Sequence, residues 1–164
     1  MTNSYQFITR WRFETTAARV FGLISKPQEF PRWWGSVYLN AEQIAAGDEK
    51  GAGRVVRFVT KGFLPYRLNW DSQTVDVIRP LRIVVRAAGD FAGEGIWTFE
   101  EQGAFTNVIF DWRVDAEKPL LKNLSWLFKP LFKANHRWAM EEGRKGLVCE
   151  LTGTENIGLA ASNR

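Results

Sequence analysis

The only histidine of the chain, His136, lies in a segment with helical periodicity at 132–147. It stands four residues after Phe132 and four before Met140, so the three side chains share one face of the expected helix. A histidine that faces a cavity can orient a ligand or transfer a proton, although a catalytic histidine usually needs a carboxylate that orients its ring. The competing interpretation is a neutral core histidine, hydrogen-bonded to a backbone carbonyl or to water. The sequence alone leaves both open.

Two carboxylates, Asp90 and Glu94, flank a glycine-rich stretch, GDFAGEG, and are the second group that could do chemistry. A pair of carboxylates in different environments can act as acid and base. At the tip of a hairpin such residues are usually solvated, and we favour that interpretation. The chain has one cysteine, Cys149, and one histidine, so the sequence predicts no intrachain disulfide, no zinc site and no other cofactor.

Strands and one long helix must position these residues. The segment 5–14 alternates aromatic and polar residues, which is typical of a strand with one wet face. Short helices are expected at 17–25 and 27–34, the first beginning after a threonine that can cap it. Further strands, separated by turn-forming residues, are expected at 37–42, 54–60, 66–77, 81–88, 95–101 and 106–114.

After the segment DAEKP, the spacing of the apolar residues changes to that of a helix. We expect a short helix at about 119–128 and a long one at about 131–151, with the helix interrupted or kinked at Pro130, because proline lacks an N–H and clashes with the preceding turn. Gly143 and Gly146 each weaken the long helix by about 1 kcal/mol relative to alanine, which indicates a close approach by the sheet or by a ligand. A helix of this length can lie along the concave face of the sheet.

Aromatic residues make up 14% of the chain, with eight Trp and twelve Phe, which is more than a minimal core needs. This composition is typical of a bulky core or of a cavity lined by rings. The net charge of +4 is too small to indicate nucleic-acid binding. No apolar run is long enough to cross a membrane and the N-terminus lacks a signal pattern, so a cytoplasmic location is expected.

The segments RWRFETTAARVFGLISKPQEFPRWW, GDFAGEGIWTF, TNVIFDWRV and NHRWAMEEGRKGLVCEL resemble those of bacterial polyketide cyclase/dehydrase-type proteins of the START-like (SRPBCC) superfamily. The resemblance extends over about residues 5–151. It implies an α+β helix-grip fold, in which a curved antiparallel sheet of about seven strands surrounds one long C-terminal helix and two short helices separate the first two strands. We expect one such domain over 1–152 and a flexible tail over 153–164.

The resemblance also implies a hydrophobic small molecule, lipid, polyketide-like or quinone-like, bound between the sheet and the long helix. The residues expected to line its site are Trp70, Trp97, Phe99, Phe110, Trp112, Phe132, His136, Met140 and Gly143. One alternative is a cyclase, dehydratase or aromatase that uses the same cavity, in which His136 works with an inward carboxylate or with Tyr66. Another is a packed domain without a ligand that acts through its surface.

The stretch SWLFKPLFK, at 125–133, mixes aromatic residues with lysines, as segments that touch a membrane surface do. We favour a packed helix with a solvated basic face over a transient membrane contact. The expected partner is therefore a hydrophobic small molecule and not a nucleic acid. The sequence leaves open whether the protein is a monomer or a homodimer.

Overall fold

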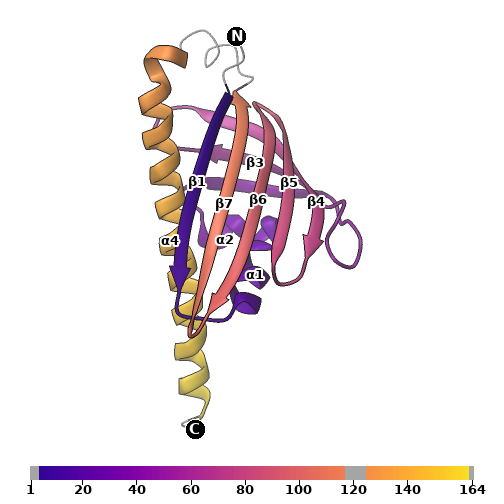
Figure 1. The fold of residues 1–164 in the computed structure, drawn as a ribbon, viewed down its shortest axis with the longest axis vertical. Coiled ribbons are helices and arrows are strands. Elements are labelled where there is room, and N and C mark those ends of the chain that lie inside the picture. The colour runs from indigo at the N-terminus through magenta and orange to yellow at the C-terminus, as the bar shows by residue number, and fades with distance from the viewer. Residues whose placement is uncertain (1–3, 117–124, 163–164) are drawn as a thin grey trace.

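Antiparallel strands form one curved sheet in the computed structural model, which describes residues 4–116 and 125–162 (Figure 1). The strands are β1 (Ser4–Phe13), β2 (Tyr38–Ala45), β3 (Val55–Lys61), β4 (Arg67–Ile78), β5 (Arg82–Gly89), β6 (Phe91–Gln102) and β7 (Phe105–Ala116). Within these residues the sheet has seven strands in the order β1-β7-β6-β5-β4-β3-β2. All neighbouring strands pair antiparallel, as expected.

Short helical segments follow β1: α1 (Ala17–Ile24), η1 (Pro27–Glu29) and α2 (Phe30–Trp33). Thr16 caps α1, because its hydroxyl accepts a hydrogen bond from the backbone N–H of Arg19 at 3.4 Å. The long helix α4 (Ser125–Ser162) lies beside β1 and contacts α1 and α2 (Figure 1). This arrangement confirms the predicted α+β helix-grip fold. In the described part of the chain, none of the helices is both long and apolar enough to cross a membrane.

Alternate residues of each strand face the concave side of the sheet. In β7, the residues Val108, Phe110, Trp112 and Val114 are buried, whereas the residues between them are half-buried or exposed. The predicted alternation at 106–114 is therefore confirmed. Because the neighbouring strands follow the same period, the large rings of the sheet gather on its concave face.

β6 begins at Phe91 rather than at Gly95, so the glycine-rich stretch is largely strand. The turn before β6 is at Gly89, whose φ of +128° favours glycine. A Cβ at Gly95 would lie 2.8 Å from the ring of Phe110 and 2.9 Å from that of Trp112. Gly95 therefore makes room for these two rings within the sheet instead of forming a turn.

The predicted interruption of the C-terminal helix at Pro130 is wrong, because α4 is continuous from Ser125 to Ser162; a kink at Pro130 stays a prediction. Pro130 lies in the second turn of α4, where the loss of one backbone hydrogen bond near the helix end is tolerated. The short helix predicted at 119–128 falls mostly on 117–124, which lie outside the described residues. The helical backbone also continues past Leu151 into the predicted tail; the flexibility of that tail stays a prediction.

Gly143 and Gly146 let α4 approach α2 closely. A Cβ at Gly146 would overlap the backbone oxygen of Trp33, and one at Gly143 would crowd the indole of Trp34. The Nε1 of Trp34 donates a hydrogen bond to the backbone oxygen of Ala139 at 2.8 Å. The glycines mark a close approach, as the sequence indicated, but the neighbour is α2 and not the sheet or a ligand.

Candidate ligand-binding pocket

A cavity of about 170 Å³ lies between the concave face of the sheet, α4 and the segment from α1 to α2. All seven described strands contribute to its lining. Of the 32 described residues that line it, 12 are Phe, Tyr or Trp, and none is Asp or Glu. The charged side chains among them are Lys50 and Lys61, which are exposed and therefore lie at the rim. The interior is an apolar space surrounded by rings.

Three rings of β6 and β7, those of Trp97, Phe110 and Trp112, form one side of the cavity, which we call the ring wall. The rings of Trp97 and Phe110 stack with their centroids 3.9 Å apart and their planes inclined by 14°. Phe110 stacks in turn on Trp112 at 5.7 Å. Because Trp97 and Phe110 are register partners, strand pairing itself sets this arrangement. The ring wall offers a ligand an apolar surface of stacked rings.

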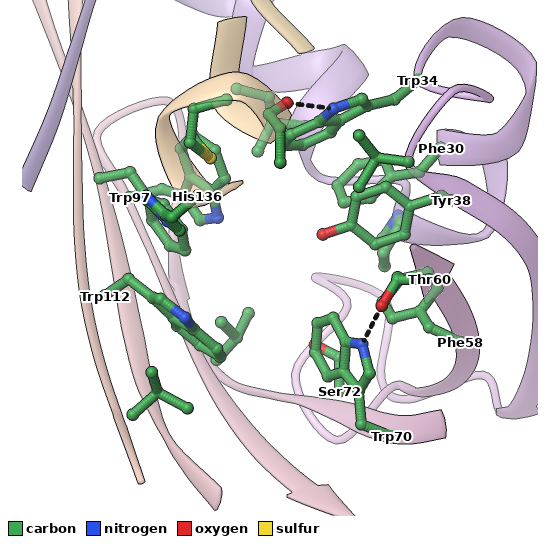
Figure 2. Close-up of a pocket in the computed structure, with 18 of the residues that line it drawn as sticks. Phe30, Trp34, Tyr38, Phe58, Thr60, Trp70, Ser72, Trp97, Trp112 and His136 are labelled. Atoms are coloured by element: carbon green, nitrogen blue, oxygen red, sulfur yellow. Dashed lines mark hydrogen bonds between the residues drawn. The ribbon is translucent and has the colours of Figure 1, made fainter. Parts of the chain in front are cut away.

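The opposite side of the cavity, from β2, β3 and β4, is more polar (Figure 2). We call Tyr38, Thr60, Ser72 and Thr74 the hydroxyl wall. Tyr38 and Thr60 are register partners in β2 and β3. The Nε1 of Trp70 donates a hydrogen bond to Oγ1 of Thr60 at 3.1 Å. Thr60, Ser72 and Thr74 are all buried, so their hydroxyls lie within the apolar interior.

The hydroxyl of Tyr38 points into the open middle of the cavity (Figure 2). Burial raises the pKa of this hydroxyl above its usual value, so it stays protonated at neutral pH. The ring is held by Phe58, with centroids 4.7 Å apart, and by Trp34, at 4.9 Å. The aromatic part of Tyr38 therefore belongs to the core, whereas its O–H faces the space for a ligand.

His136 lines the same cavity from α4, and its ring stacks on Phe7 of β1 with centroids 4.1 Å apart and planes inclined by 15°. Burial lowers the pKa of His136 from 6.5 to about 4, so the imidazole is neutral at pH 7. No carboxylate is present among the lining residues that the structure describes. The pair of His136 with an inward carboxylate, expected for an enzyme, is therefore not formed.

Two tyrosines, Tyr5 and Tyr66, line the end of the cavity near His136. Tyr5 stacks on Phe7 with the ring centroids 6.0 Å apart, and the ring of His136 also stacks on Phe7. Burial raises the pKa of Tyr66 to about 12, and it also raises the pKa of Tyr5. Both hydroxyls are therefore protonated at neutral pH and can donate hydrogen bonds.

The loop between β3 and β4 is fastened to α4 next to His136. Oδ1 of Asn135 accepts a hydrogen bond from the backbone N–H of Phe63 at 2.9 Å. The ring of Phe63 meets Trp138 edge-on, with centroids 6.3 Å apart. Gly62 and Asn135 are both part of the cavity lining, so this contact closes one side of the cavity.

Seven of the nine residues predicted to line the site do so: Trp70, Trp97, Phe110, Trp112, Phe132, His136 and Met140. The placement of Phe99 and Gly143 in the lining is wrong. Phe99 is 1% exposed and packs edge-on against Phe21 of α1, with centroids 5.2 Å apart. Gly143 faces the indole of Trp34. That the other seven bind a ligand stays a prediction.

Asp90 and Glu94 lie on parts of the sheet that do not line the cavity. Oδ2 of Asp90 accepts a hydrogen bond from the backbone N–H of Asn69 at 2.9 Å. Glu94 is exposed on the outer face of β6. Glu94 is solvated, as the sequence favoured, but it lies within β6 and not at a hairpin tip, whereas Asp90 is half-buried and holds the backbone of Asn69.

Sequence reasoning missed the hydroxyl wall. Ser72 and Thr74 lie two and four residues after Trp70 on β4, so the period of two could have placed them on the same face as that tryptophan. Thr60 pairs with Leu68 in the same way but needed the register of β3 and β4. Tyr38 carried no periodic signal, because it is the first residue of β2.

The chain matches a family model described as "Polyketide cyclase / dehydrase and lipid transport" over residues 9–152. No curated protein matches its sequence. The crystal structure of TTHA0849 from Thermus thermophilus has a TM-score of 0.71 at 19% identity, and the match covers 89% of this chain and 99% of that one. For the Zhui aromatase/cyclase from Streptomyces, the TM-score is 0.72 at 12% identity, with 90% and 93% covered.

Norcoclaurine synthase from Thalictrum flavum, in complex with dopamine and hydroxybenzaldehyde, is similar with a TM-score of 0.60 at 15% identity, and the match covers 91% of this chain and 88% of that one. At these identities the likeness shows the fold alone. The family match supports a role in binding a hydrophobic ligand or in cyclisation. Because the family model spans nearly the whole sequence, the chain belongs to the polyketide cyclase/dehydrase and lipid transport family.

Proposed function

We propose that this protein binds a small hydrophobic molecule with one or two rings in the cavity between the sheet and α4. One observation carries the proposal: a space of about 170 Å³ that is lined by 12 aromatic residues and, among its described lining residues, by no carboxylate. Burial of apolar surface, at about 25 cal/mol per Å², provides the driving force. A few polar groups inside an otherwise apolar pocket then fix the orientation of the ligand.

The volume of the cavity favours a compact ring system over an extended lipid. An engineered apolar cavity of about 150 Å³ binds benzene. A space of about 170 Å³ therefore accommodates one ring or a compact bicyclic molecule. A long acyl chain requires the cavity to widen, so a polyketide-like or quinone-like ligand of this size fits better.

A pair of alanine substitutions on α4 tests the proposal. Ala139 lines the cavity and Ala134 is exposed on the same helix. In Ala139→Phe the new ring occupies the space for the ligand, and we expect the affinity for naphthalene, measured by quenching of tryptophan fluorescence, to fall at least tenfold. Ala134→Phe should bind like the wild-type protein. The proposal fails if the wild-type protein binds no ring compound or if Ala139→Phe binds as well as Ala134→Phe.

Native mass spectrometry of the freshly purified protein provides a second readout. We expect a co-purified compound of low mass in the wild-type protein and none in Ala139→Phe. This comparison also supplies the mass of the natural ligand. A compound retained equally by both proteins would place its binding site outside the cavity.

A cyclase or dehydratase that uses the same cavity is the second candidate, which the shared position of His136, Tyr5 and Tyr66 favours. A neutral imidazole can accept a proton and protonated tyrosines can donate one. A pKa of about 4 makes His136 a weak base at pH 7, so binding ranks first. Incubation with a poly-β-ketone distinguishes the two: an enzyme changes the ratio of cyclised products from the spontaneous one, and His136→Ala restores the spontaneous ratio while naphthalene still binds.

A further inference from the structure

The two sides of the cavity offer different hydrogen-bonding groups to a molecule between them (Figure 2). The ring wall has only indole N–H groups and phenyl rings, so it contains no acceptor. The hydroxyl wall lies across the open space from Trp97 and Trp112. A ligand that fits both sides must therefore present an apolar face to the first and a polar group to the second.

Thr60 is prepared to donate a hydrogen bond. An indole N–H is a donor only, so in its contact with Trp70 at 3.1 Å the hydroxyl oxygen of Thr60 is the acceptor. Thr60 therefore keeps its own hydrogen for another partner. The residue is 6% exposed, and no acceptor for this hydrogen is present among the residues that the structure describes. Hydrogen bonding from Trp70 also polarises the Thr60 O–H and strengthens its donation.

Tyr38 supplies a second donor at the same place. It is the register partner of Thr60, so the two side chains lie next to each other on the concave face. Burial raises the pKa of Tyr38, and the hydroxyl keeps its proton. This O–H points into the middle of the cavity and has no hydrogen-bond partner in the described part of the chain. An acceptor on a ligand that occupies the cavity can therefore pair with this donor.

We infer that the pocket selects a planar, uncharged ring compound that carries a carbonyl oxygen, such as an aromatic ketone or a quinone. Its ring lies against Trp97 and Trp112, and its oxygen accepts hydrogen bonds from Tyr38 and Thr60. The inference rests on the proposed function, because it assigns the chemical class of the ligand for the same cavity.

The surroundings disfavour a charged ligand. A carboxylate or phenolate inside the cavity needs a buried cation, and the lysines of the lining, Lys50 and Lys61, are exposed at the rim. An ammonium group needs a carboxylate, and the described lining contains none. Neutral His136 offers an acceptor nitrogen on the other side of the space, where a hydroxyl of a ligand would bind instead of a carbonyl.

Three bicyclic compounds of similar shape test the inference: 1-tetralone, tetralin and the carboxylate of tetralin, each titrated by isothermal calorimetry. We expect 1-tetralone to bind about tenfold more tightly than tetralin and the carboxylate to bind most weakly. Equal dissociation constants for 1-tetralone and tetralin would overturn the inference while the proposed function stands. If none of the three binds, both are overturned.

Single substitutions then locate the discrimination. In Tyr38→Phe and in Thr60→Val, the preference for 1-tetralone over tetralin should fall about three- to tenfold, and Thr60→Ser, which keeps the hydroxyl, should retain it. Thr98→Val is the matched control, because Thr98 lies between Trp97 and Phe99 on the outer face of β6. Unfolding by urea verifies that each variant is folded. A preference unchanged in Tyr38→Phe and in Thr60→Val would overturn the inference.

Discussion

Two stretches of α4 face different surroundings although they belong to one continuous helix. The stretch near the middle, with Gly143, Gly146 and Leu147, packs against α2 and α1, and Leu147 is fully buried. The stretch that contains Phe132 and His136 faces the cavity. The middle stretch fastens α4 to the rest of the protein, and the preceding stretch borders the space proposed for a ligand.

This difference has its origin in the partners of the helix. Glycines on α4 allow contact with the backbone of α2. In the core beside α1, Phe21 and Phe99 pack edge-on against each other. Around Phe132 and His136, the hydroxyl wall and the ring wall line a cavity of about 170 Å³ that side chains do not fill. The contacts that hold α4 in place and the residues of α4 that line the cavity therefore lie in different stretches of the same helix.

The largest difference is expected when one ring is truncated in the packed core and one beside the cavity. Phe99→Ala removes a ring from the packed region, and we expect the free energy of unfolding to fall by about 3–5 kcal/mol. Phe132→Ala removes a half-buried ring next to the cavity, and we expect less than half of that loss. Urea denaturation measures both. Equal losses would mean that the region around the cavity is as tightly packed as the core below it.

Acidification should lower the stability of the protein through His136, which faces the cavity. Its pKa is 6.5 when unfolded and about 4 when folded, so above pH 6.5 the imidazole is neutral in both states and contributes nothing. As the pH falls below 6.5, the unfolded state binds a proton that the folded state does not. The free energy of unfolding should therefore fall by about 2 kcal/mol between pH 7 and pH 5. The same urea experiment on His136→Phe should show a flatter dependence; an identical slope would contradict the assignment.

A methyl group added at each of two glycines of α4 compares a closely packed position with an open one. Gly146→Ala places a Cβ against the backbone oxygen of Trp33, and we expect a loss of about 1–2 kcal/mol despite the higher helix propensity of alanine. At Gly153 a Cβ meets no atom within 4 Å, so Gly153→Ala should stabilise the protein by up to about 1 kcal/mol. Thermal unfolding of both variants gives the signs, and a stabilising Gly146→Ala would refute the close contact.

The smallest effect is expected where the loop between β3 and β4 meets α4. Asn135→Ala removes the acceptor for the N–H of Phe63, which should lower stability by about 1 kcal/mol or less. Hydrogen exchange is the sharper measurement, because the amide of Phe63 should lose protection while the amides of β6 do not. Asn107→Ala, which removes an exposed side-chain contact with Gln102, is the control. Unchanged protection of Phe63 would show that Asn135 does not hold the loop.

Periodicity predicted the strands, the long helix and the face of the ring wall, whereas the helix-grip arrangement of these elements was implied by the family resemblance. Alternation at 106–114 placed Phe110 and Trp112 on the concave face, and the long apolar stripe placed His136 and Met140 opposite them. Alternation gives the face of a residue but not its depth. Phe99 shares the face of Trp97, yet it lies farther along β6, where it packs against Phe21 of α1 and does not line the cavity.

The errors and omissions have equally specific causes. The rule that proline breaks helices applies to helix interiors, and Pro130 lies in the second turn of α4. The hydroxyl wall escaped prediction because serine and threonine in strands usually face solvent. Their burial here depends on the register that sets Tyr38 beside Thr60, which no local pattern encodes.

Gly95 influences the volume of the cavity from a position outside its lining. It does not touch the cavity, but the rings of Phe110 and Trp112 lie where its side chain would be. Any larger residue at this position should displace those two rings into the cavity and reduce its volume. A larger residue at this position should therefore restrict the cavity to smaller ligands, although the residue itself does not line it.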